Sequence, residues 1–137
     1  MERPETKARA RALQLLYAFE LSGLPSIEAV VTRLAQASGV SPIGYDRGAE
    51  LAARAVAGQR EYDERLSRAE EHWRLERVGV VERNILRLAL AELDEGATPP
   101  RVVLDEAVKL AHWFGGAKSP AFVNGVLDAV ARETGQL

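Results

Sequence analysis

Hydrophobic residues recur along this chain at the three- and four-residue spacing that is typical of amphipathic α-helices. Runs of β-branched and aromatic residues, which favour strands, are scarce. The pattern predicts about seven helices, and the first of them covers residues 7–21 and ends at the pair Ser22-Gly23. The chain is therefore expected to be all-α.

Capping residues and glycines separate the next predicted helices. Ser26 is a candidate N-cap for a second helix that Gly39 would end, and Asp46 is a candidate cap for a third helix within residues 41–58. A fourth helix is expected over residues 60–73. Positive and negative charges are nearly balanced over residues 60–77, five against six, so we interpret the polar side of this helix as a solvated face.

Residues 74–93 form a predicted helix that is apolar around most of its circumference. One hydrophobic stripe contains Val81 and Ile85, and a second contains Leu86 and Leu90. A helix with this pattern is normally surrounded by other helices. We therefore expect it at the centre of a helical bundle.

The last two predicted helices flank a glycine-rich turn. The sixth helix follows residues 98–100 and ends at Gly115-Gly116. Ser119 and Pro120 then supply an N-cap and a proline at the first position of the seventh helix. Because every predicted linker is short, residues 1–137 are expected to form a single domain.

Composition excludes several classes of function. Apolar residues make up 47% of the 137 residues and charged residues 28%, as in ordinary globular proteins. The absence of Cys excludes disulfides, thiolate metal sites and Cys nucleophiles. His72 and His112 lie in different segments, and the common nucleotide-binding and hydrolase motifs are missing. We therefore expect no enzyme activity, no metal and no cofactor.

The distribution of charge and hydrophobicity bears on location and partners. No apolar run approaches the roughly 20 residues of a membrane span, and the charged start lacks the apolar region of a signal peptide. A cytoplasmic protein is expected. The net charge is only −2, whereas nucleic-acid-binding domains are usually basic. Any RNA contact must therefore come from a local concentration of cations.

Such a concentration occurs at the start of the chain. Four positive charges in residues 1–12 stand against two negative ones, and the positive residues are Arg3, Lys7, Arg9 and Arg11. Lys7, Arg11 and Gln14 share one face of the predicted helix, and Arg9 is expected beside them. These cations can bind phosphates or form a solubilising tail, and spacing alone does not decide between the two.

Two of the three Phe residues, Phe114 and Phe122, bracket the glycine-rich turn. The hydrophobic stripes favour burial of both rings. A ring at a helix end can also keep one face packed and offer the other to a nucleobase. Lys118, Ser119 and the backbone N–H groups that follow are then candidates for a phosphate or a base edge.

The pair Asn124-Gly125 lies inside the seventh predicted helix. Gly125 costs that helix about 1 kcal/mol relative to Ala, which either close helix packing or the approach of a ligand would explain. Asn124 can read a base or bond to the backbone.

Taken together, three segments resemble the NusB family of transcription antitermination factors. They are KARARALQLLYAFELSG near the start, HWRLERVGVVERNILRLALAEL in the middle, and PPRVVLDEAVKLAHWFGG followed by SPAFVNGVLD. The resemblance covers nearly the whole chain and implies two small helical bundles packed together. Glu5 and Thr6 stand where arginines are common in the family, and Asp105 replaces the more usual Asn.

The resemblance also implies a function. Proteins of this family bind the single-stranded boxA element of ribosomal RNA leader transcripts together with the ribosomal protein NusE. The pair belongs to the complex that keeps RNA polymerase from terminating early. Carried over to this chain, with Arg11 added for its charge, the RNA-binding residues are Lys7, Arg9, Arg11, Gln14, Phe114, Lys118, Ser119, Phe122 and Asn124. The residues implied for the NusE surface are Tyr17, Leu21, Arg77 and Glu82.

Two other functions stay open at this point. One is a helical adapter that binds proteins without RNA contact. The other is a module related to ribosomal-RNA cytosine methyltransferases, which carry a long cofactor-binding domain that has no place in this chain. A homodimer is also left open. On the RNA-binding hypothesis, the N-terminal cations and the two rings are expected to form one strip for unpaired nucleotides.

Overall fold

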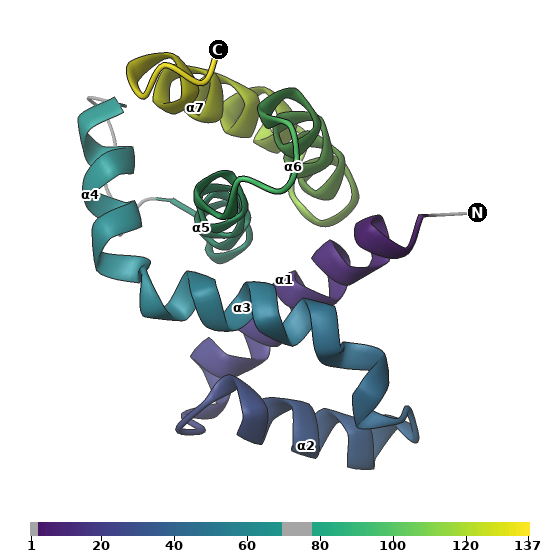
Figure 1. The fold of residues 1–137 in the computed structure, drawn as a ribbon. Coiled ribbons are helices and arrows are strands. Elements are labelled where there is room, and N and C mark those ends of the chain that lie inside the picture. Colours follow the sequence, from purple (N-terminus) through teal and green to yellow (C-terminus); the bar gives the residue numbers. More distant parts are fainter. Residues whose placement is uncertain (1–2, 70–77) are drawn as a thin grey trace. The chain divides into compact units, whose positions relative to one another are not determined.

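A computed structural model describes residues 3–69 and 78–137, and every regular element in these ranges is a helix. The elements are α1 (Pro4–Ser22), α2 (Ile27–Ser38), the short 3-10 helix η1 (Pro42–Tyr45), α3 (Asp46–Ala57), α4 (Gln59–Ala69), α5 (Val80–Glu95), α6 (Pro100–Phe114) and α7 (Ser119–Glu133) (Figure 1). The all-α class and the seven predicted α-helices are confirmed.

The chain divides into two compact units. The first comprises Met1–Ala57 with α1, α2, η1 and α3, and the second comprises Gly58–Leu137 with α4 to α7. They correspond to the two small bundles that the family resemblance implies.

In the first unit, α1 packs mainly against α3, and α2 contacts both helices. The close approach of α3 to α1 depends on Gly48, because a Cβ atom there would lie 3.1 Å from the Ala8 carbonyl oxygen and 3.2 Å from the Ala12 nitrogen. Large apolar side chains of the two helices, such as Leu15 of α1 and Leu51 of α3, are fully buried. The exposed side of α1 is thereby left for other contacts.

Helix ends in the first unit follow the predicted residues, with one exception. Gly23 ends α1 with φ 71°, and Gly39 ends α2 with φ 74°. The Ser26 hydroxyl accepts a hydrogen bond from the backbone N–H of Ala29, as predicted for an N-cap. The predicted cap at Asp46 is wrong. Because η1 runs directly into α3, Asp46 already has helical backbone angles (φ −50°, ψ −54°).

In the second unit, α5 is the central helix, as predicted. All residues from 84 to 93 are buried, and α5 contacts α4, α6 and α7, which surround it in Figure 1. Its first described helical residue is Val80, later than the predicted start. The apolar residues around this helix are therefore covered by neighbouring helices, as expected.

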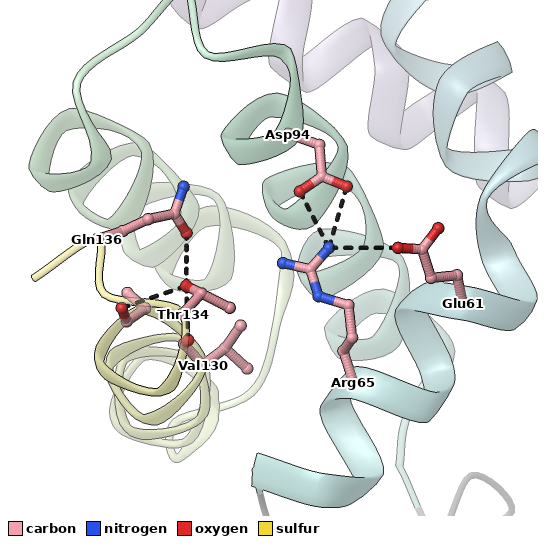
Figure 2. A network of polar contacts seen from close by, with 7 residues as sticks. Glu61, Arg65, Asp94, Val130, Thr134 and Gln136 are labelled. Carbon is pink, nitrogen blue, oxygen red and sulfur yellow. Dashed lines mark hydrogen bonds and ion pairs between the residues drawn. The ribbon is translucent and has the colours of Figure 1, made fainter.

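Two arginine–aspartate pairs join α4 to α5. The buried Arg87 guanidinium donates to both carboxylate oxygens of Asp63, at 2.9 and 2.8 Å. Arg65 donates to both carboxylate oxygens of Asp94 at 3.0 Å, and the same guanidinium nitrogen lies 4.0 Å from Glu61 (Figure 2). Two charges that the sequence interpretation assigned to a solvated face, Asp63 and Arg65, are thus bound to α5. That interpretation was wrong for them.

Neither a membrane span nor a metal cluster is apparent in the part of the chain that the structure describes. No single helix there is both long and apolar enough to cross a membrane. Only α1 and α2 taken as a pair, bent by 102°, reach that length and composition. Over the same residues, no group of three or more His, Cys, Asp or Glu side chains lies close enough to hold a metal ion.

Candidate nucleic-acid interface

The exposed face of α1 changes in chemistry along the helix. Lys7, Gln14 and Leu21 follow one another at intervals of two turns, so they lie on the same side, and all are exposed. Tyr17 lies one turn before Leu21, and the exposed fractions of these two residues are 46% and 65%. The helix therefore presents a cation and an amide first and an apolar patch later.

The two predicted arginines on α1 have different surroundings. Arg11 is half-buried, and its guanidinium carbon lies 4.9 Å from the centre of the Tyr45 ring in η1, a cation–π contact. Arg9 is only 6% exposed. We expected it beside Lys7, but two residues along a helix correspond to a rotation of about 200°, which turns its side chain to the other side. That placement was wrong.

Glu5, an acidic residue at the start of α1, is paired with a cation from another helix. Glu5 lies 3.5 Å from the Arg47 guanidinium of α3, and Arg47 also pairs with Glu50. Thr6, the neighbour of Glu5, is buried. The contact between Arg47 and this helix could not be predicted from the sequence, because no local pattern links residues so far apart. Its charge offsets that of Glu5 in an exposed pair.

In the second unit, the turn between α6 and α7 is closed by its own hydrogen bonds. The Gly115 N–H donates to the Ala111 carbonyl at 2.9 Å, and the Ser119 N–H donates to the Gly116 carbonyl at 3.0 Å. A Cβ atom at Gly115 would lie 2.6 Å from the Ser119 hydroxyl and 2.8 Å from the Ala111 oxygen. Only glycine fits at position 115 in this turn.

Ser119 binds the turn to α5 through its side chain. Its hydroxyl accepts from the Gly116 N–H at 2.9 Å and donates to a Glu82 carboxylate oxygen at 3.2 Å. The predicted N-cap role is wrong, since α7 begins at Ser119 and the residue before it, Lys118, is the cap position. Ser119 and Glu82 thus bind to each other inside the unit. The side chains of residues that contact RNA, as predicted for Ser119, or NusE, as predicted for Glu82, would be expected to be exposed.

The rings on either side of the turn differ in exposure. Phe114 is 50% exposed, whereas Phe122 is half-buried. Burial of Phe114, favoured by its hydrophobic stripe, is wrong, since α6 ends at this residue. Lys118 and Asn124 are both exposed. The end of α6, the turn and the start of α7 therefore present one open ring, one half-covered ring, a cation and an amide.

A further aromatic residue, Trp113, was missed by sequence reasoning. It is 42% exposed, and its ring stands at 89° to that of Phe114 with 6.4 Å between the ring centres. The Lys109 ammonium lies 6.0 Å from the Trp113 ring centre. Trp113 does not belong to the hydrophobic stripe of α6, and this feature of the sequence could have indicated that its ring is exposed.

The glycine inside α7 lies in open space. Among the residues that the structure describes, no atom outside its own helix would come within 4 Å of a Cβ atom at Gly125. Close packing against a described helix of its unit, one of the two predicted explanations, is therefore excluded. Arg77, the remaining predicted partner residue, lies outside the described residues.

Comparison with known proteins identifies the family. The NusB family model matches residues 6–132. The transcription antitermination protein NusB of Solibacter usitatus (strain Ellin6076) is 42% identical over 128 residues, covering 93% of this chain and 88% of that protein. The solved T. maritima NusB superimposes with a TM-score of 0.82 at 30% identity, covering 97% and 94% of the two chains.

A second solved chain comes from a complex of the antitermination factors NusB and NusE with dsRNA. It superimposes with a TM-score of 0.81 at 29% identity and covers 97% of this chain and 99% of its own length. None of these similarities supports the homodimer that the sequence left open. The family is non-enzymatic, so the expectation of no enzyme activity is confirmed. The matched residues and the shared fold show that this chain belongs to the NusB family of transcription antitermination proteins.

Proposed function

We propose that this protein binds boxA-type single-stranded RNA in the leader transcripts of ribosomal RNA operons, together with the ribosomal protein NusE. The pair would act in the cytoplasm, within the complex that keeps RNA polymerase from terminating early. The observation that supports RNA binding most directly is the half-exposed Phe114 ring beside the exposed Lys118 at a closed turn. Family membership and the complex of a relative with NusE support NusE and RNA as the partners, and the choice of a single strand rests on the exposed ring.

In the second unit, the end of α6, the turn and the start of α7 together offer three kinds of contact for an unpaired nucleotide. The open face of Phe114 can stack on a base, which contributes about 1–3 kcal/mol per base in proteins of this kind. Lys118 can neutralise a phosphate, and the Asn124 amide has both a donor and an acceptor for a base edge. Phe122 contributes the half-exposed part of its ring.

In the first unit, the N-terminal half of the exposed α1 face supplies the phosphate contacts. Lys7 is exposed, Gln14 follows it on the same side, and the Arg11 guanidinium is held over Tyr45. Arg9 is not assigned a direct RNA contact, because it is buried.

The C-terminal half of the same face is assigned to NusE. Tyr17 and Leu21 are large, exposed and apolar, and residues of this kind are typical of the centre of protein interfaces. Glu82 is assigned to holding the turn through Ser119 and not to a direct NusE contact, because one carboxylate oxygen accepts from the Ser119 hydroxyl and the other is buried.

The test is a titration with fluorescent RNA, in the absence and presence of purified NusE. Three probes of equal length are used: boxA-type single strand, scrambled single strand, and a boxA duplex. The expected result is preference for the boxA single strand, with tighter binding when NusE is present. If no probe is bound under either condition, the protein is an adapter without RNA contact. If the duplex is preferred, the stacking role of Phe114 is wrong.

A further inference from the structure

Trp113 and Phe114 form a pair of exposed aromatic rings at the C-terminal end of α6. The two residues are 42% and 50% exposed, although large aromatic side chains are usually buried in monomeric proteins. Their rings meet edge to face at 89°. A ring that served only the core would be covered, so this pair is available to a ligand.

The charges around Trp113 favour a polyanion. Lys109 lies over the ring at 6.0 Å, and the exposed Lys118 follows in the turn, five residues after Trp113. Lys109 also lies 3.7 Å from the buried Glu106, and the exposed Asp105 precedes it by one turn. Binding of a phosphate by Lys109 therefore competes with one local ion pair.

The angle between the two rings selects the form of the nucleic acid. Successive bases in a duplex are parallel, so they cannot stack on two ring planes that stand at 89° to each other. Successive unpaired bases can be splayed to different angles and stack on separate aromatic side chains.

We propose that Trp113 is a second stacking platform for RNA, which binds the nucleotide adjacent to the one on Phe114. This inference rests on the proposed function and deepens it. The two rings would bind neighbouring unpaired bases, while Lys109 moves from the Trp113 face to the intervening phosphate. The pair then contributes to the discrimination of single strands from duplexes.

The chain allows a direct spectroscopic test, because it contains only two tryptophans, Trp73 and Trp113. The Trp73→Phe variant makes Trp113 the sole tryptophan reporter. Stacking of a base on the indole is expected to quench its fluorescence when the boxA single strand is added, and the duplex is expected to leave the emission unchanged. Saturation with the single strand without any change in emission would overturn the proposal.

Affinity measurements provide the second arm. Trp113→Ala is expected to weaken binding of the single strand by about 5- to 150-fold, which corresponds to the loss of one stacked base. Trp113→Phe should retain most of the affinity. The matched control is Val102→Ala, which removes another exposed apolar side chain of α6 and should leave the affinity unchanged.

Abasic nucleotides identify the partner base. If the base that stacks on Trp113 is removed, the abasic RNA should bind the wild type and Trp113→Ala with equal affinity. A second abasic position should likewise equalise the affinities of the wild type and Phe114→Ala. The two positions should be adjacent in the RNA. If Trp113→Ala binds the single strand as tightly as the wild type, or loses affinity for NusE alone, Trp113 is not an RNA platform. A wild-type protein that binds no RNA would instead overturn the proposed function as well.

Discussion

At the scale of single residues, the bond between Ser119 and Glu82 has the clearest energetic consequence. Ser119→Ala removes the acceptor for the Gly116 N–H and leaves a Glu82 oxygen without its donor. The expected loss in the free energy of unfolding is about 1–3 kcal/mol, as for other part-buried polar groups left unpaired. Urea unfolding measures it.

The control for this variant is Ser67→Ala. The Ser67 hydroxyl donates to a carbonyl of its own helix on the exposed side of α4, so its removal should change stability by less than about 0.5 kcal/mol. Equal stabilities for the two variants would show that the Ser119 bonds contribute nothing to the turn.

A substitution at Gly125 is expected to have opposite effects on the stability of the protein and on its affinity for RNA. Because a Cβ atom there meets none of the described residues within 4 Å, Gly125→Ala should stabilise α7 by up to about 1 kcal/mol. If RNA passes close to this backbone, the same methyl group should weaken RNA binding. Thermal unfolding and RNA titration of one variant test both statements. A gain in stability without any loss of affinity would show that the RNA does not approach this glycine.

At the scale of elements, the two arginine–aspartate pairs between α4 and α5 should differ in their energetic weight. Asp63→Ala leaves the buried Arg87 guanidinium without its main partner, and removal of one partner from a buried pair costs about 3–5 kcal/mol. Asp94→Ala breaks the more exposed pair in Figure 2, which should cost about 1 kcal/mol or less.

These two carboxylates form a matched comparison, because both bind an arginine across the same pair of helices. Guanidinium chloride would screen the pairs, so urea is the suitable denaturant. A larger loss for Asp94→Ala than for Asp63→Ala would contradict the assignment by burial.

The elements themselves were largely predictable from the sequence, because apolar spacing and capping residues act over a few residues. Ser26 and Gly39 set the ends of α2 in this way. Contacts between distant residues were not predictable, as with Arg87 and Asp63, which no local pattern links. The burial of Arg9 could have been predicted, because the rotation of the helix between Lys7 and Arg9 places the two side chains on opposite sides.

The candidate site was predictable in its residues and less so in their surroundings. The family resemblance supplied Phe114 and Ser119, but their hydrophobic and capping patterns gave the wrong environment for both. Phe114 is exposed since its helix ends there, and the Ser119 hydroxyl is used by a turn that closes on α5. The exposure of a ring and the partner of a hydroxyl depend on where a helix ends relative to the neighbouring helices. The local pattern of residues does not contain this information.

At the scale of the whole molecule, a net charge of −2 means that RNA is attracted only by local groups. Lys7→Gln should therefore weaken binding and reduce the slope of log affinity against log salt by about 0.7, the value for one phosphate on a single strand. Phe114→Ala should weaken binding without changing this slope, since stacking releases no counterions. RNA titrations at several salt concentrations distinguish the two.

The control for charge is Arg33→Gln, which removes an exposed cation of α2 outside the proposed surfaces. It should leave both the affinity and the slope unchanged. If Arg33→Gln and Lys7→Gln alter the slope equally, binding depends on overall charge and the α1 face has no special role.

The closed turn between α6 and α7 has a kinetic consequence. Its backbone groups and the Ser119 hydroxyl are already bonded to one another and to Glu82 in the absence of any ligand. A preorganised loop loses little conformational entropy when a ligand arrives, so the encounter needs no slow ordering step. Changes to the rings should consequently shorten the residence time of the RNA and leave its association rate nearly constant.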